Sequence, residues 1–173
     1  MYGVASTCEL RLFGHGGLWV DGAPAKLAKR ATTLSLLGYL VLHRSVAVSR
    51  AALAYTLFPE ESEEAALGEL RRYLYLTNKL VSAGTEPWIL ADGETARWNP
   101  NAACTVDVIA FEDGVTRAST QAAAVALYTG DLWPVGELQV IAADTRPLTA
   151  ELFAAGFRWT QRPLYLGRGL WHP

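Results

Sequence analysis

The sequence predicts an α+β fold, with a small antiparallel sheet, three helices and a β-hairpin. Three observations support it. Residues 62–81 carry apolar side chains at helical spacing, residues 9–28 alternate like short strands, and an Asp-Gly pair divides a later stretch into two strands. All three lie before the turn residues Asn99-Pro100-Asn101, where we place a domain boundary.

The composition of the 173-residue chain is that of a core-forming protein, with 51% hydrophobic residues and a formal net charge of −2. No stretch approaches the roughly 18 consecutive apolar residues of a membrane span. The N-terminal residues also lack the basic and apolar segments of a signal peptide, so we expect a cytoplasmic protein with no membrane partner. For Cys8 and Cys104, far apart in sequence, we favour reduced thiols over a disulfide or a metal site.

Residues 9–28 are expected to form the small sheet, because apolar and polar residues alternate in ELRLF and LWVDG. The segments Gly14–Gly17 and Asp21-Gly22 separate the strands as turns. A phosphate-binding loop would need a helix directly after the glycines. Here another strand-like stretch follows, so we interpret Gly14–Gly17 as a hairpin turn.

Two helices follow the sheet in this prediction. Residues 29–43 carry a broad apolar face at helical spacing. After a short link at residues 46–48, Ser49 can cap a second helix that runs to Phe58 and is ended by Pro59.

The third helix, Ser62 to Val81, is the best-marked element. Ser62 can cap its first turn, where Glu63 and Glu64 suit the positive end of the helix dipole. At about 100° per residue, one arc is apolar and faces the core. This inward arc holds Ala66, Leu67, Leu70, Tyr73, Leu74, Leu80 and Val81, interrupted by Thr77. The outward arc holds Glu64, Gly68, Arg71, Arg72, Tyr75, Leu76, Asn78 and Lys79.

A hairpin is predicted next. The stretches 89–91 and 95–98 flank Asp92-Gly93, a pair whose tolerance of positive φ makes it a strong hairpin signal. Sheet, three helices and hairpin, in this order, form a winged helix-turn-helix. In that arrangement the third helix lies in a DNA major groove, and the hairpin, or wing, contacts the backbone or the minor groove.

Several segments of the chain carry a family resemblance. LRLFG, LWVDG, KRATTLSLLGYLVLH, VSRAALAYTLFPEES, ELRRYLY and WILADGETARWNP occur in this order, followed by VDVIAFE and ALYTGDLWP. The first six resemble the OmpR-like winged-helix domain of SARP-type bacterial transcriptional regulators. The last two are similar to the start of the bacterial transcriptional activator domain, an all-helical, TPR-like module. The resemblance covers about Leu10 to Pro134.

The resemblance implies three segments: a winged-helix DNA-binding domain at 8–100, the start of a helical activator-type domain at 101–135, and a divergent or truncated tail at 136–173. It also implies partners, namely double-stranded DNA at direct-repeat promoter sites, RNA polymerase, and a second copy of the chain on DNA. No cofactor is implied.

Catalysis is not expected. The histidines His15, His43 and His172 are scattered, and no nucleophile stands near a base in a recognisable motif. We therefore predict no enzyme activity, no catalytic residue and no metal site.

The candidate DNA-binding residues are cations and polar groups on predicted exposed positions. Arg can bind guanine, and Asn can bind adenine, through two hydrogen bonds in the major groove. Cations near helix starts can neutralise phosphates. The predicted residues are Arg71, Arg72, Tyr75, Asn78 and Lys79 on the third helix, Arg97 on the hairpin, and Lys29, Arg30 and Arg50 near helix starts.

The charge balance leaves a second function open. Residues 1–100 hold ten Lys and Arg against ten Asp and Glu, so few phosphates would be neutralised. Leu76 also occupies an outward position where the family often has Arg. A protein–protein interaction module, or a truncated regulator that no longer binds DNA, would show the same features.

Overall fold

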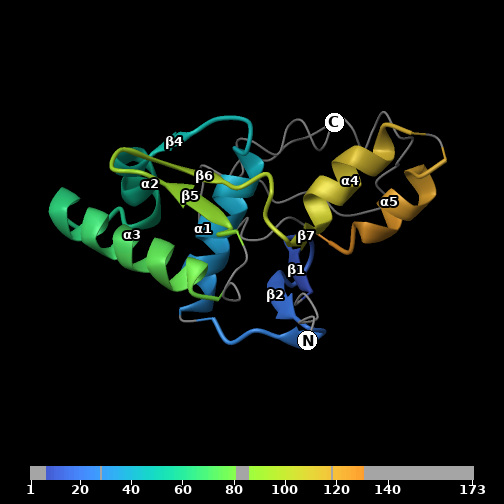
Figure 1. The fold of residues 1–173 in the computed structure, drawn as a ribbon, viewed down its shortest axis with the longest axis horizontal. Helices are drawn as coiled ribbons and strands as arrows, with labels where there is room; N and C mark the ends of the chain where they lie inside the picture. The colour runs from blue at the N-terminus through green and yellow to red at the C-terminus, as the bar shows by residue number, and fades with distance from the viewer. Residues whose placement is uncertain (1–6, 28, 81–85, 118, 131–173) are drawn as a thin grey trace, which may run out of the picture.

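A computed structural model describes residues 7–27, 29–80, 86–117 and 119–130 (Figure 1). The elements are β1 (Cys8–Arg11), β2 (Gly17–Val20), β3 (Ala23–Pro24), α1 (Arg30–Leu42), β4 (Val48–Ser49), α2 (Arg50–Leu57), α3 (Glu63–Asn78), β5 (Ile89–Ala91), β6 (Thr95–Trp98), β7 (Thr105–Val106), α4 (Asp107–Val115) and α5 (Gln121–Leu127). In Figure 1, α2, α3 and the β5–β6 hairpin lie at one end and α4 and α5 at the other, with α1 between them. The predictions for Val81 and for residues 131–173 lie outside the described residues.

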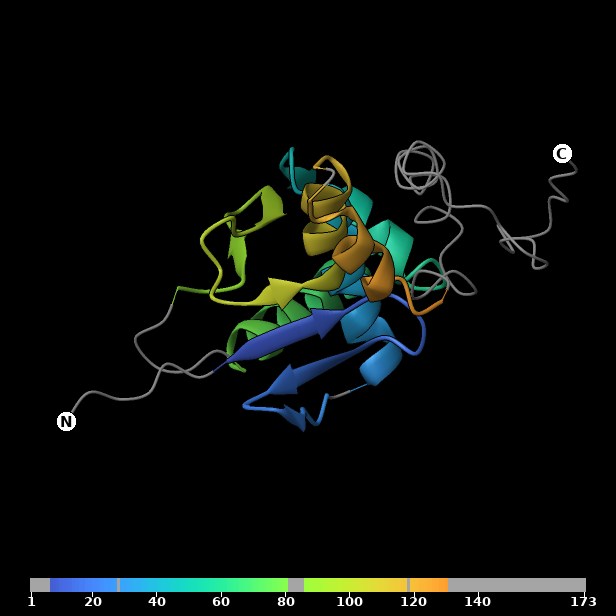
Figure 2. The same ribbon diagram turned by 90° about the vertical axis from the view of Figure 1, so that its right-hand side faces the viewer.

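The N-terminal sheet has the strand order β3-β2-β1-β7. The predicted antiparallel pairing of β1 with β2 is confirmed, with Leu10 opposite Leu18. Asp21 and Gly22 form the turn to β3 with φ of 52° and 77°, as a two-residue hairpin turn requires. The fourth strand was not predicted: β7 lies parallel to β1, as Figure 2 shows for the yellow and dark blue arrows.

Helix α1 forms the centre of the molecule. Every residue from Thr33 to Val41 is buried, since apolar or small residues surround the whole helix rather than one stripe. The predicted caps of the next two helices are confirmed. Ser49 accepts a hydrogen bond from the Ala52 amide at the start of α2, and Ser62 accepts one from the Ala65 amide at the start of α3.

The predicted hairpin is confirmed, but its turn differs from the expectation. Neither Asp92 nor Gly93 has a positive φ, because the strands pair only up to Ala91 opposite Ala96 and leave a longer turn. The Asp92 carboxylate closes this turn by accepting hydrogen bonds from the amides of Glu94 (2.8 Å) and Thr95 (2.6 Å). These bonds lower the pKa of Asp92, with the Thr95 amide as the largest cause. The predicted link before α2 also contributes a strand, β4, which pairs with β6.

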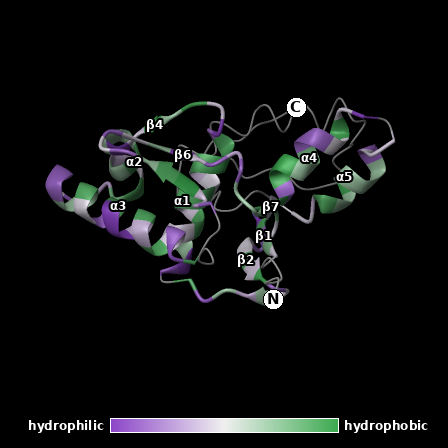
Figure 3. Cartoon of the chain, in the orientation of Figure 1, coloured by the Kyte–Doolittle hydropathy of each residue, from purple (hydrophilic) through white to green (hydrophobic). Residues whose placement is uncertain are grey.

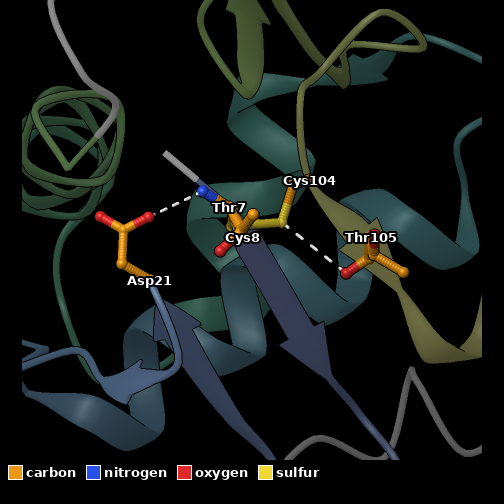
Figure 4. Close-up of a disulfide and its surroundings, with 5 residues drawn as sticks. All are labelled: Thr7, Cys8, Asp21, Cys104 and Thr105. Carbon is orange, nitrogen blue, oxygen red and sulfur yellow. Dashed lines mark hydrogen bonds between the residues drawn. A yellow bond between two sulfur atoms is a disulfide. The ribbon is translucent and has the colours of Figure 1, made fainter. Parts of the chain in front are cut away.

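The expectation of two reduced thiols is wrong, because Cys8 and Cys104 form a disulfide (Figure 4). The two residues are 96 positions apart, a separation that gives no sequence signal. In space, Glu9 pairs with Thr105 across the parallel strands β1 and β7, so the residues directly before them are neighbours. Their Cα atoms are 4.5 Å apart.

The start of α4 is bound to the end of β1 by Asp107. Its carboxylate accepts hydrogen bonds from the backbone amides of Leu12 and Phe13, each at 2.9 Å. Burial raises the pKa of Asp107, and the two amides oppose this shift. Phe111 of α4 lies edge-on to Phe13, with ring centres 5.6 Å apart. These contacts join residues on both sides of the predicted boundary near residue 100.

Candidate nucleic-acid interface

Helix α3 divides its residues as the sequence predicts. Ala66, Leu70, Tyr73, Leu74 and Thr77 are buried on the inward side. On the outward side, Arg71, Arg72, Tyr75 and Lys79 are exposed, and we call these four residues the α3 face. Leu76 was expected to face outward, but it is half-buried rather than exposed. Figure 3 shows the hydrophilic residues of α3 as purple bands along the helix.

The cations of the α3 face have weak partners in the protein. The Arg72 guanidinium is 3.5 Å from the carboxylate of Glu69, but the Arg72 side chain is 58% exposed, so water screens the pair. The Lys79 ammonium lies 5.9 Å from the centre of the Tyr75 ring. Arg71 makes no ion pair with any residue that the structure describes. All three cations are therefore available to an anionic partner.

Arg97 is on the hairpin. It is exposed on β6, between the buried residues Ala96 and Trp98, and lies opposite Leu90 of β5. Because neighbouring residues on a strand point to opposite faces, the burial of Ala96 and Trp98 directs Arg97 away from the core. The structure thus leaves this predicted wing cation in solvent.

Asn78, a predicted base contact, has partners within the protein. Its side-chain nitrogen donates to the Ile89 carbonyl at 2.8 Å, and its side-chain oxygen accepts from the Ile89 amide at 3.0 Å. Both ends of the amide are thus occupied by β5, and the residue is half-buried. An adenine contact would compete with both bonds. The reason is position: Asn78 ends α3 and is turned towards the hairpin, not outward.

Arg50, a predicted phosphate contact, also has partners within the protein. Its guanidinium donates to the Asp92 carbonyl at 2.7 Å, and its backbone amide donates to the Glu94 carbonyl at 2.8 Å. Arg50 therefore binds the turn of the hairpin to the start of α2. Sequence spacing gave no sign of this contact, because 42 positions separate Arg50 from Asp92.

Lys29 and Arg30 lie at the start of α1. The Arg30 guanidinium donates to the His15 carbonyl at 2.9 Å and to the carbonyl of Gly16, so it supports the β1–β2 turn. The predicted phosphate contact of Arg30 stays a prediction beside this internal contact. Lys29 is the N-cap residue of α1 and is exposed.

Two further residues, one on α3 and one on α2, were missed by sequence reasoning. Glu69 pairs with Arg72 at i,i+3 spacing, a signal that the sequence contains. Tyr55 of α2 is 76% exposed, more than Tyr75 at 64%. Among the described residues, no group of three His, Cys, Asp or Glu could hold a metal ion. In the same ranges no helix has the length and apolarity of a membrane span.

Comparison with known proteins supports the fold. No family model and no curated protein matches the chain. The solved structure of Mycobacterium tuberculosis EmbR in complex with a low-affinity phosphopeptide matches it with a TM-score of 0.70 and 21% identity. The match covers 87% of this chain and 44% of the EmbR chain, so this chain spans less than half of that protein. At this identity the likeness concerns the fold, and it confirms the predicted mixture of small sheets and helices.

Proposed function

We propose that the chain is a DNA-binding transcription regulator of the SARP type. In this proposal α3 lies in a major groove, and the β5–β6 hairpin contacts the neighbouring backbone or minor groove. The observation that carries it is the α3 face, which presents three cations and a tyrosine beside a hairpin with its own exposed cation, Arg97. The order of elements and the likeness in fold to EmbR support the same conclusion.

The charges on α3 indicate which part of the helix approaches DNA. Glu60, Glu61, Glu63 and Glu64 are exposed at or just before its start. Phosphates would repel these carboxylates. Arg71, Arg72 and Lys79, by contrast, would attract the phosphates. We therefore place the middle and the C-terminal end of α3 in the groove. Arg71 and Arg72 are suited to guanine, and Lys79 to a phosphate.

The resemblance to SARP-type regulators adds the remaining parts of the proposal. Direct-repeat promoter sites, a second copy of the chain on DNA, and contact with RNA polymerase are properties of that family. Residues 8–100 would supply DNA binding, and residues 101–135 the start of the activator-type domain.

Fluorescence anisotropy with a randomised duplex pool, at two salt concentrations, tests DNA binding directly. We expect Arg72→Ala to weaken binding roughly 10-fold or more, as loss of a base contact does, with little change in thermal unfolding. Lys79→Ala should weaken binding and reduce the salt dependence by about one unit of slope. Arg117→Ala is the matched control, because it removes an exposed cation beyond α4. If both α3 variants bind like the parent, the face is assigned wrongly.

A protein-interaction module, or a regulator that no longer binds DNA, is the alternative. It is favoured by the neutral charge balance of residues 1–100 and by the exposure of Tyr55 and Tyr75, since exposed aromatic residues are enriched at protein interfaces. Absence of duplex binding at low salt, from a chain that unfolds cooperatively, would favour this alternative.

A further inference from the structure

At the outer edge of the hairpin, a side chain forms hydrogen bonds with the backbone of the edge strand. Strand β5 is an edge strand, because the sheet has the order β4-β6-β5. Trp88, just before β5, is directed towards the opposite side of the hairpin, because its carbonyl accepts a hydrogen bond from the Asn99 amide at 2.8 Å. Ile89, the next residue, therefore directs its amide and carbonyl away from β6. Both groups need a partner, since an unpaired backbone group is costly where water is excluded.

Asn78 supplies that partner. Its amide group donates to the Ile89 carbonyl and accepts from the Ile89 amide, as the peptide group of an additional strand would. Ile89 itself is only 1% exposed, so few water molecules can replace these bonds. The last residue of α3 is in this way joined to the base of the hairpin.

The other end of the hairpin has a separate attachment. Arg50 binds the turn at Asp92 and Glu94, but Arg50 belongs to α2. Within the described ranges, Asn78 is the one residue of α3 that makes a hydrogen bond to the hairpin. Among the described residues, this contact alone relates the position of the hairpin directly to that of α3 by hydrogen bonding.

We propose that Asn78 is a positioning residue that holds Arg97 of the hairpin in a fixed relation to the α3 face. The two elements then meet DNA as one rigid surface, and Arg97 gains its contact without a further loss of conformational freedom. This inference rests on the proposed function. Asn78 contributes without touching DNA, which distinguishes it from Arg71 and Arg72.

A double-mutant cycle on DNA binding tests the coupling. In the parent chain, Arg97→Ala should weaken duplex binding. In the Asn78→Ala background the same change should cost at least about threefold less, because a displaced hairpin no longer brings Arg97 to the duplex. Asn101→Ala is the matched control: Asn101 is exposed after β6, and its loss should leave the effect of Arg97→Ala unchanged.

Amide hydrogen exchange at Ile89 in the free protein gives a readout that does not need DNA. Asn78→Ala should speed exchange of the Ile89 amide, and Asn101→Ala should not. Asn78→Asp keeps the acceptor for this amide and loses the donor to the Ile89 carbonyl, so it should protect the amide better than Asn78→Ala does. Asn78→Asp also serves as a second variant if Asn78→Ala does not fold.

Each outcome decides a different point. Unchanged exchange at Ile89 in Asn78→Ala would show that the Asn78 side chain does not hold the base of the hairpin. Faster exchange with an unchanged cost of Arg97→Ala would overturn the positioning role. Failure of the parent chain to bind any duplex would overturn the proposed function and this role with it. The exchange at Ile89 would still report whether Asn78 is hydrogen-bonded to Ile89.

Discussion

Two regions of the molecule are held together in different ways. The helix–hairpin region, residues 48–98, contains α2, α3 and the sheet β4-β6-β5. Its links include side-chain hydrogen bonds from Asn78 to Ile89, 11 positions apart, and from Arg50 to Asp92, 42 positions apart. The sheet–α4 region, residues 8–20 and 104–115, is joined by contacts 94 to 96 positions apart, including a disulfide. The sheet–α4 region thus contains a disulfide, whereas the helix–hairpin region carries the exposed cations of the α3 face.

The largest expected difference between the regions is in the cost of losing an aromatic ring. Phe111 is fully buried in α4 and packs edge-on against Phe13. Phe111→Ala should lower the free energy of unfolding by about 3–5 kcal/mol. Tyr75→Ala, at an exposed position of α3, should change it by less than about 0.5 kcal/mol. Denaturant unfolding of both variants measures the contrast, and equal costs would contradict it.

The second difference concerns the disulfide. The paired change Cys8→Ser with Cys104→Ser should cost about 2–4 kcal/mol, because the bond closes a loop of nearly the whole described chain. Thermal unfolding with and without a reductant is the measurement. Reductant should lower the midpoint of the parent and leave that of the paired variant unchanged. A parent midpoint that does not respond would show that the disulfide does not stabilise the fold.

The same contrast explains what the sequence could predict. The burial pattern of α3 follows from helical periodicity, so its Ser62 cap and the burial of Ala66, Leu70, Tyr73 and Leu74 were predicted. Leu67, also expected on the inward arc, is half-buried, and the helix ends at Asn78 before Leu80. The contact of Cys8 with Cys104 depends on β7 joining the sheet, and a two-residue strand has no periodicity to detect. Local patterns therefore predicted the helices, the hairpin and the β1–β2 pairing, and they missed the contacts that depend on the short strand β7.

The internal contacts of the candidate site residues were not predicted, for a related reason. Periodicity places Asn78 on the outward arc, but the hairpin packs against the end of α3 and binds it. Arg50 and Arg30 look like free cations in sequence and are bound to backbone carbonyls in the fold. The two Asp-Gly pairs show the same limit: Asp21-Gly22 adopts positive φ, whereas Asp92-Gly93 does not.

The third difference is in the response to acid. Hydrogen bonds lower the pKa of Asp92 in the hairpin, so its contribution to stability is present above about pH 4 and is lost as the pH falls through the lowered pKa. Burial raises the pKa of Asp107, so the folded state holds that proton more tightly. Its contribution is present below about pH 4 and is lost as the pH rises through the raised pKa.

Carboxyl titration by NMR, with unfolding measured across the same pH range, checks these signs. The difference in unfolding free energy between the parent and Asp92→Asn should shrink as the pH falls. Asp107→Asn should remove the loss of stability that the parent shows as the pH rises through the raised pKa of Asp107. If both carboxyl groups titrate on the same side of the ordinary aspartate value, the two regions do not differ in this respect.

The smallest expected change in stability sharpens the account of the α3 face. Glu69→Gln breaks the exposed pair with Arg72 and should alter the unfolding free energy by less than about 0.5 kcal/mol. Duplex binding should nevertheless become a few-fold tighter, because Arg72 loses a competing carboxylate and the duplex loses a repelling charge. Glu61→Gln removes an equal charge from the loop before α3, away from Arg72. A gain specific to Glu69→Gln, and absent when Arg72 is Ala, would show that the pair restrains Arg72. Equal gains from both changes would assign the effect to net charge. Pairing with Glu69 would then not reduce the availability of Arg72 to DNA.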